Sequence, residues 1–300
     1  MSSKTNGRRS VLMMVSSMLI FGTIGVFRRY IPVSSAFLAC SRGMLGGLCI
    51  LLFLRLKKQK PEGKIPRRAL LGLAVSGMLI GFNWMLLFEA YNHTTVAVAT
   101  LCYYMQPTIV MLLSPLFFRE RLTPWKAACA AVAVAGMVLV SGVVGESGAQ
   151  NGSLRGILLG LGAAVFYSAV VIMNNKIQGI DPCRKTTVQL FSAGLVMIPY
   201  LLIAGDFGFE GGFGPVPAVL LFVVGVVHTG IAYVLYFGSM DGLRVQTVAI
   251  LSYIDPVSAL LFSAFLLREP LSVLKIVGAV MIIGSAVASE IKPGAGSADA

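Results

Sequence analysis

Three ionisable residues, Arg42, His228 and Asp255, lie deep inside long apolar stretches of the sequence. Each is about ten residues from both ends of its stretch, which at ~1.5 Å of rise per residue is near the middle of a membrane-spanning helix. Ionisable groups at that depth are costly and usually face a cavity or a partner. These side chains are therefore the first candidates for binding or proton transfer.

Asp255 precedes Pro256, and Gln106 precedes Pro107 in an earlier apolar stretch. A proline inside a helix leaves the carbonyl one turn earlier without its partner, so each proline predicts a helix discontinuity with a polar patch. In such a patch the carboxylate of Asp255 can bind a proton or a cationic group of a substrate. The alternative is a structural ion pair with Arg42.

Arg42 suits a clamp on a substrate carboxylate, because a guanidinium donates two parallel hydrogen bonds. Its alternatives are a fixed partnership with Asp255 and a side chain that reaches back to the membrane surface. His228 is a candidate proton relay, since imidazole changes charge near neutral pH. The alternative for His228 is a neutral imidazole that is hydrogen-bonded to a neighbouring helix.

Aromatic residues recur at helical spacing in the same stretches, and two of these positions are aromatic in both halves of the chain. A lining of this kind suits planar apolar or cationic substrates, through stacking or cation–π contacts. Helix packing is the alternative. Three groups follow this pattern: Trp84, Phe88 and Tyr91; Tyr233 and Phe237; and Tyr103 with Gln106, three residues apart on one face.

Three acidic residues lie nearer the ends of the apolar stretches and are interpreted as structural or interfacial. Glu89 is near the end of its stretch and is expected at the membrane interface. Glu120 and Glu269 come just before Thr123 and Ser272, which are predicted N-caps of the following helices.

The composition indicates that these stretches lie in a membrane. Of 300 residues 57% are hydrophobic and only 12% charged, with a mean hydropathy of +0.85, whereas soluble domains carry about 25% charged residues. This composition excludes a soluble enzyme, a disordered chain and a nucleic-acid-binding domain. The +12 net charge does not indicate a nucleic-acid partner, because it sits in short runs between apolar stretches, as in loops at a membrane surface. No metal-ligand, disulfide or phosphate-loop motif is present, so we expect no metal and no cofactor.

A membrane-spanning helix needs about 20 mostly apolar residues, and ten stretches fit this length. They are continuously apolar rather than alternating, which argues against barrel strands. The first is interpreted as a retained helix, since no cleavage site for a signal peptide follows it. The stretches are 11–27, 33–54, 69–90, 95–117, 125–143, 154–174, 186–204, 217–239, 245–267 and 273–289.

Basic residues between the stretches predict the orientation. With the N-terminus in the cytoplasm, 18 of the 24 lysines and arginines fall in cytoplasmic segments and five outside, while Arg42 lies within a stretch. Basic loops stay in the cytoplasm, so both termini are predicted there. We expect a cytoplasmic tail over 1–10, two five-helix repeats over 11–143 and 154–290, and a second cytoplasmic tail over 291–300.

The two halves match when the sequence is shifted by 149 residues. Tyr104 then falls on Tyr253, Pro107 on Pro256, and Arg119–Glu120 on Arg268–Glu269. Because each half has an odd number of crossings, the second half should sit inverted in the membrane. Inverted five-helix repeats are typical of transporters, with a substrate site at the repeat interface.

The repeated segments also carry a family pattern: a third helix of small and aromatic residues, a fourth with a central proline, then an acidic residue before the fifth. The segments are GFNWMLLFEAYNHTTVAVATLCYYMQPTIVMLLSPLFFRERLTPWK and GIAYVLYFGSMDGLRVQTVAILSYIDPVSALLFSAFLLREPLSVLK. This pattern resembles the EamA family of the drug/metabolite transporter superfamily. The resemblance implies a ten-helix bundle that moves small metabolites, often as an exporter, without specifying the substrate.

The leading hypothesis is a secondary transporter that exports a small organic metabolite, such as an amino acid or an amphiphilic amine, across the cell (inner) membrane by alternating access. Its expected partners are the solute, protons and the lipid bilayer. An intramembrane enzyme that acts on a lipid through Asp255 and His228 is one alternative, and a channel is another. The inverted repeat favours the transporter, because catalysis does not need two inverted halves.

Overall fold

The computed structural model describes residues 2–57, 63–118, 123–140, 153–205, 207, 214–240, 243 and 245–290. This part of the chain forms fourteen α-helices and one π-helix. The helices are α1 (Ser2–Gly22), α2 (Ile24–Arg29), α3 (Ser35–Leu56), α4 (Arg67–His93), α5 (Val96–Tyr103), α6 (Gln106–Phe118), α7 (Pro124–Val140), α8 (Leu154–Lys176), α9 (Pro182–Ala204), α10 (Pro215–Gly225), η1 (Val226–Ile231), α11 (Ala232–Met240), α12 (Val245–Ser252), α13 (Ile254–Leu266) and α14 (Val273–Glu290).

The prediction of an all-helical chain is confirmed for the described residues, and each of the ten predicted stretches overlaps a helix in its described part. Within the described ranges, seven helical segments are long and apolar enough to cross a membrane, and three further apolar helices are shorter. The count of ten crossings therefore stays a prediction. The predicted tail 291–300 and the pair Arg119–Glu120 lie outside the described residues.

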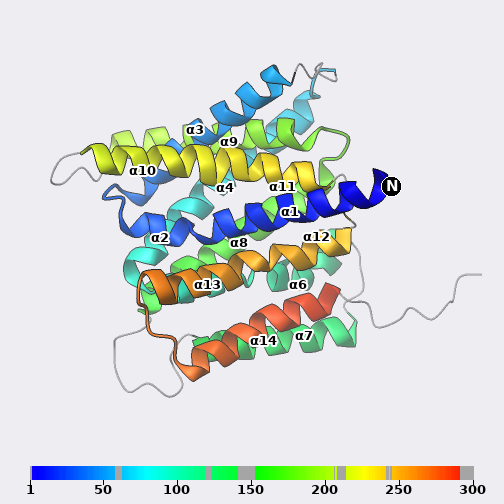
Figure 1. The fold of residues 1–300 in the computed structure, drawn as a ribbon, viewed down its shortest axis with the longest axis vertical. Helices are drawn as coiled ribbons and strands as arrows, with labels where there is room; N and C mark the ends of the chain where they lie inside the picture. The colour runs from blue at the N-terminus through cyan, green and yellow to red at the C-terminus, as the bar shows by residue number, and fades with distance from the viewer. Residues whose placement is uncertain are drawn as a thin grey trace, which may run out of the picture.

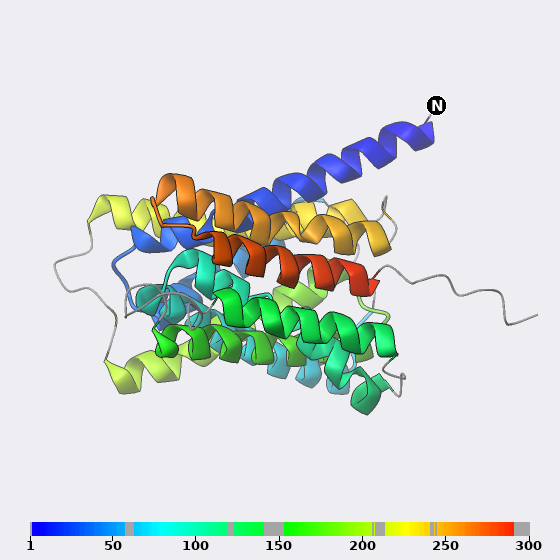
Figure 2. The ribbon, with the colours of Figure 1, turned by 90° about the horizontal axis from the view of Figure 1, so that it is seen from below.

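The largest difference from the predicted boundaries is at the N-terminus, where α1 begins at Ser2 instead of residue 11. The segment expected to be a tail continues the helix. A search for apolar residues finds only the part of a helix suited to lipid, and no proline stops this helix from continuing through polar residues. In Figure 2 this end of α1 projects beyond the other helices.

Polar side chains begin several of the helices, as expected of N-caps. The hydroxyl oxygens of Ser34, Thr95 and Ser153 accept hydrogen bonds from amides three residues later, at 3.2 Å each. The predicted N-caps Thr123 and Ser272 are confirmed, with donors at 3.3 and 3.4 Å. These caps satisfy amides that have no carbonyl partner within the helix.

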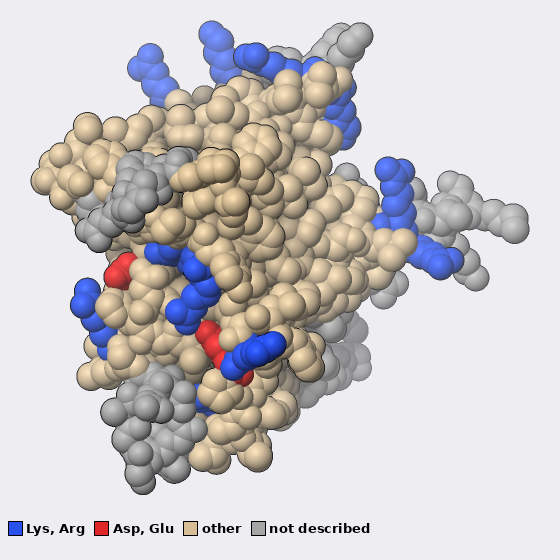
Figure 3. Space-filling view, turned by 60° about the vertical axis from the view of Figure 1, so that its left-hand side comes forward, with Lys and Arg blue, Asp and Glu red and all other residues tan. Residues whose placement is uncertain are grey.

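The helices lie side by side and run across the view of Figure 1. The main packed pairs are α3 with α9, α4 with α8 and α9, and α1 with α11 and α13. The helices α7 and α14 pair with each other at the lower edge of Figure 1. Figure 3 shows Lys and Arg gathered toward the ends of the bundle, with broad areas of other residues between them.

Glycines let several helices approach closely, because a residue without a side chain leaves room for a neighbouring backbone. A Cβ added to Gly43 of α3 would lie 2.7 Å from backbone atoms of α9, and one on Gly77 of α4 would lie 2.4 Å from the Gln189 carbonyl. Gly136 and Gly278 bring α7 and α14 together in the same way. Larger residues at these points would push the helices apart.

Two helices are broken at equivalent places. The first break separates α5 from α6 at Tyr104 and Met105, and the second separates α12 from α13 at Tyr253. Tyr104 and Tyr253 are 149 residues apart and have nearly the same backbone angles, with φ of −73° and −74°. Each tyrosine lies three residues before a proline, where that ring removes a helical hydrogen bond. Tyr104 and Tyr253 both line one cavity inside the bundle.

Candidate functional site

A cavity of about 430 Å³ lies between the two broken helices and α1, α3, α4, α8 and α11. Seven of the nine tyrosines in the chain line it. Among the predicted site residues, the lining includes Arg42, Trp84, Tyr103, Gln106, Pro107, Tyr233 and Asp255. Ligand pockets commonly have volumes of ~300–1,000 Å³, so this cavity is large enough for a small organic molecule.

Arg42 extends from α3 into the cavity wall and is only 5% exposed. Its Nε donates to Thr229 Oγ1 at 2.8 Å, and the Thr229 hydroxyl in turn donates to the Val224 carbonyl at 3.0 Å. The guanidinium lies 4.1 Å from the centre of the Trp84 ring and 5.7 Å from that of Phe88. Its two Nη nitrogens have no hydrogen-bond partner within the described part of the chain.

Asp255 lies at the start of α13, just after the second break. The hydroxyl of Tyr104, at the first break, donates to Asp255 Oδ2 at 2.5 Å. The other carboxylate oxygen has no partner among the residues that the structure describes. Within those same residues no ion pair joins Asp255 to Arg42. The cavity thus holds an acid and a guanidinium that each keep free hydrogen-bonding atoms.

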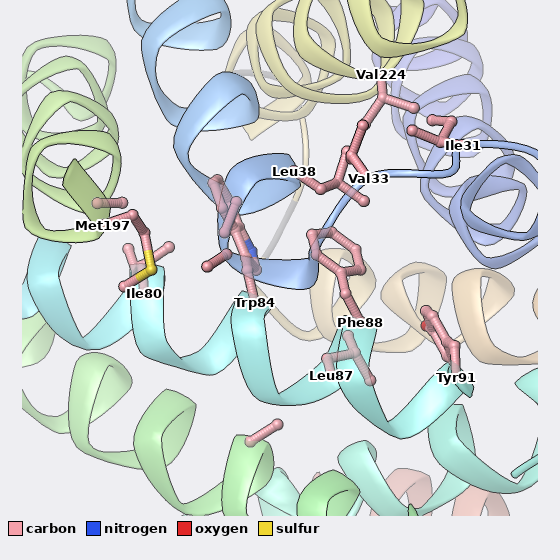
Figure 4. Close-up of a cluster of buried hydrophobic side chains, with 14 of the residues drawn as sticks. Ile31, Val33, Leu38, Ile80, Trp84, Leu87, Phe88, Tyr91, Met197 and Val224 are labelled. Atoms are coloured by element: carbon pink, nitrogen blue, oxygen red, sulfur yellow. The ribbon is translucent and has the colours of Figure 1, made fainter. Parts of the chain in front are cut away.

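Some of the predicted aromatic residues line the cavity, and others pack outside its lining. Trp84, Tyr103 and Tyr233 line the cavity, whereas Phe88 and Phe237 do not. Phe88 is fully buried among apolar side chains, and Figure 4 shows Trp84 and Phe88 rising from the side of α4 that faces Leu38 and Val33. Phe237 stacks on Tyr233 with ring centres 5.9 Å apart. The stripe expected to line the cavity therefore lines it only in part, because neighbouring turns also contact other helices.

His228 is buried in the π-helix η1 and is not part of the lining. Its Nε2 is 2.8 Å from the Thr23 hydroxyl, and its ring packs edge-on against Phe27 with centres 4.5 Å apart. The histidine thus joins η1 to the junction of α1 and α2. This geometry matches the alternative of an imidazole hydrogen-bonded to a neighbouring helix. It also separates His228 from Asp255, so the pair behind the enzyme hypothesis is not brought together in the cavity.

Sequence reasoning missed four lining tyrosines: Tyr104, Tyr167, Tyr236 and Tyr253. The repeat held a signal for two of them, because Tyr104 and Tyr253 are equivalent and each lies three residues before a proline. Tyr236 follows the candidate Tyr233 by three residues and so lies near it on the helix. Tyr167 of α8 belongs to none of the aromatic groups at helical spacing, and its repeat equivalent is Met18, so no pattern in the sequence pointed to it.

Most of the lining comes from positions that are equivalent in the two repeats. Fourteen of the lining residues form seven pairs that are 149 residues apart. The pairs are Met18 with Tyr167, Gly22 with Val171, Trp84 with Tyr233, Leu87 with Tyr236, Tyr103 with Ser252, Tyr104 with Tyr253, and Gln106 with Asp255. Arg42 is not part of such a pair, since Phe191 holds the equivalent place outside the lining.

Two acidic residues contact polar groups near the end of the bundle where α5 begins. Glu89 accepts hydrogen bonds from Ser35 at 2.8 Å and Asn92 at 3.0 Å, and it pairs with His93 at 3.1 Å. The sequence predicts a structural role for Glu269, just before the N-cap Ser272 of the following helix. In the structure its carboxylate accepts hydrogen bonds from the first amides of α5. Only the folded structure could reveal that contact, because the partners are 172 and 173 residues apart.

Comparisons with known proteins agree with this architecture. A model of the EamA-like transporter family matches residues 8–142 and, a second time, residues 154–289. Uncharacterized transporter YxxF of Bacillus subtilis (strain 168) is 28% identical over 280 residues, which cover 91% of this chain and 86% of that protein. Aromatic amino acid exporter YddG of Ancylobacter novellus is 29% identical over 217 residues, covering 71% of this chain and 73% of that protein.

A solved structure described as a crystal structure of a protein shares the fold. Its TM-score is 0.66 at 20% identity, and the match covers 94% of this chain and 98% of the other.

Proposed function

The chain belongs to the EamA-like transporter family, and we propose that it exports a small zwitterion with an aromatic body, of the aromatic amino acid type. We further propose that it works as a secondary transporter by alternating access across the cell membrane. One observation carries the proposal. A guanidinium and a carboxylate, both with unused hydrogen-bonding atoms, line one cavity that is rich in tyrosine.

A zwitterion satisfies both charged groups at once. Its carboxylate can accept two parallel hydrogen bonds from the free Nη nitrogens of Arg42. Its ammonium can donate to the free oxygen of Asp255. Buried charges without partners are costly, so a molecule that brings both signs of charge gains more than an amine or an acid alone.

The rest of the lining suits an aromatic body. Trp84 and the lining tyrosines present ring faces and edges, and contact between aromatic rings is favourable beyond the area that it buries. A sugar-like substrate would not need this lining. The printed name of the relative YddG, an aromatic amino acid exporter, supports the same substrate class and the outward direction.

The proposed mechanism uses ten crossings arranged as two inverted repeats. The family model matches the chain twice, and the main contacts follow a two-fold relation. The pairing of α1 with α11 corresponds to that of α8 with α4, while α3 with α9 and α7 with α14 each relate equivalent helices. A cavity lined by equivalent residues is expected on the axis between two such repeats.

Orientation and energy coupling complete the proposal. The basic residues support cytoplasmic termini, and a Cys in place of the exposed Lys64 should react with an impermeant reagent only from the cytoplasmic side. Reaction from outside would contradict the orientation. We propose Asp255 as the site where a proton couples to transport, because it is the acidic residue among the cavity-lining residues.

Counterflow in vesicles tests the substrate class. Purified protein is reconstituted with internal L-tryptophan, tryptamine or indole-3-propionate, and the uptake of labelled L-tryptophan is followed. We expect strong exchange with L-tryptophan and weak exchange with the amine and the acid, since each of these leaves one charged residue unpaired. Equal exchange with all three would contradict zwitterion recognition. Absence of any exchange would contradict the substrate class.

A further inference from the structure

Glu269 lies in the turn between α13 and α14, and its carboxylate joins three other segments. Oε1 accepts a hydrogen bond from the Val96 amide at 3.1 Å and forms an ion pair with Arg29 Nη2 at 3.0 Å. Oε2 accepts from the Ala97 amide at 3.4 Å and from the Ser263 hydroxyl. The glutamate side chain is only 10% exposed. It therefore caps α5 while holding the end of α2.

The backbone just before this residue is strained. Arg268 has φ of +54° and is the non-glycine residue with positive φ in the described part of the chain. A side chain disfavours this left-handed conformation. Strain of this kind persists where surrounding contacts enforce it, and it often marks a switch or a clamp. Here it turns the chain so that the next carboxylate reaches α5.

The bonds of Glu269 connect the two repeats. Glu269 belongs to the second family match, whereas Arg29, Val96 and Ala97 belong to the first. Arg29 also donates to the Thr94 carbonyl at 3.2 Å, close to the start of α5. Any movement that separates the repeats at this end must therefore break these bonds.

Tight packing closes the same end of the bundle. A Cβ on Gly25 would lie 2.3 Å from Val96, and one on Gly22 would lie 2.0 Å from the hydroxyl of Ser258. The helix α13 packs against both α5 and α2. Its repeat counterpart is α6, and that of α5 is α12, yet α6 and α12 are not a packed pair in the described part of the structure. Among the described residues, the opposite end thus has no packed pair equivalent to α13 with α5.

We propose that Glu269 is the gate residue at the α5 end of the bundle: it closes the cavity there while it caps α5 and pairs with Arg29, and that end opens when these bonds break. This proposal rests on the proposed transport function. The gate is reversible because Arg29 is 38% exposed, so water can reach the groups that separate. Solvation of the freed charges and amides offsets part of the loss.

Solvent access to the cavity tests the gate without any substrate. A Cys is placed at Thr100, which lines the cavity on α5, in a chain whose five native cysteines are alanine. An impermeant maleimide is added to one side of the vesicles and then to the other, which makes the test independent of orientation. In Glu269→Gln we expect labelling from the α5 side to be about tenfold faster, because charge-assisted bonds to Arg29 and two amides are weakened.

A matched variant separates the gate from a general loss of acidic charge. Glu89→Gln removes a carboxylate near the same end, but its bonds go to Ser35 and to its own helix. We expect its labelling rate to stay within about twofold of the parent, since this change leaves the cap of α5 intact. Glu269→Asp, which keeps the charge, should restore part of the slow labelling.

An unchanged labelling rate in folded Glu269→Gln would overturn the proposal and show that Glu269 only caps α5. If that variant does not fold, Arg29→Gln removes the ion pair and the hydrogen bond to the Thr94 carbonyl but keeps the cap of α5, and it should raise the rate about threefold, in line with a partly exposed pair. No increase in Arg29→Gln would equally overturn the gate. Because labelling needs no transported solute, failure of the gate is distinct from failure of the proposed substrate.

Discussion

Replacing Arg42 should weaken the binding of an amino acid but leave the binding of its matching amine unchanged or tighter. The guanidinium already uses Nε for Thr229 and one face for Trp84, which leaves the edge with the two Nη nitrogens for a ligand. L-tryptophan carries a carboxylate for that edge, and tryptamine does not. The comparison therefore isolates one contact within the same cavity.

The expected magnitude follows from the contact that is lost. Two charge-assisted hydrogen bonds contribute about 1.5–3 kcal/mol each, part of which desolvation offsets. A net loss of about 3 kcal/mol corresponds to roughly a hundredfold weaker binding of L-tryptophan to Arg42→Gln. Tryptamine should bind equally well or more tightly, because the change removes a like charge from the cavity. The affinity of Arg42→Lys for L-tryptophan should lie between those of the parent and of Arg42→Gln, since lysine keeps the charge but loses the planar fork.

Titration calorimetry with the purified protein measures these affinities directly. Arg155→Gln is the matched control, because it makes the same change at an exposed position outside this cavity. It should leave both affinities within about twofold, as expected of a distant surface residue. An equal loss for both ligands in Arg42→Gln would mean that Arg42 only supports Trp84 and η1. The zwitterion proposal would then fail.

Three further predictions concern the lining, the coupling and the helix contacts. Trp84→Ala should weaken L-tryptophan binding by about 1–2 kcal/mol in the same titration, whereas Phe82→Ala, which truncates a ring outside the cavity lining, should not. Asp255→Asn should abolish uptake driven by a proton gradient yet retain slower exchange. Wild-type pH dependence in that variant would exclude Asp255 as the proton site. Gly43→Ala should lower the melting temperature, since its Cβ meets backbone of α9, while Gly284→Ala, with open space, should raise it slightly.

The sequence was most informative where local physics decides the structure. Apolar stretches located every long helix, and hydroxyl residues such as Thr123 and Ser272 marked helix starts. The repeat was visible because polar and proline residues recur at one fixed spacing. None of these features depends on how a helix is rotated about its axis, so each can be read without a structure.

The sequence could not predict how each helix is rotated about its own axis. His228, like Arg42, was placed near the middle of its stretch, but depth alone does not say which neighbour a side chain faces. A step of one residue turns a helix by about 100°, and the π-helix η1 changes this turn at His228 itself. Tyr167 was missed for the same reason, because contact with other helices decides which face of α8 meets the cavity. The role of Glu269 could not be predicted either, because it depends on a contact between segments that are distant in the sequence.

The backbone of the cavity is more symmetric than its chemistry. Tyr104 and Tyr253 break their helices in the same way, and seven pairs of equivalent residues share the lining. Within one of these pairs, however, Gln106 is neutral where Asp255 is acidic. Symmetric backbones allow each repeat to take the conformation of the other, which is the requirement for two alternating states of similar energy. In the proposed alternating-access mechanism, a single acid and a single arginine in an otherwise repeated lining would define one binding orientation for the ligand in both states.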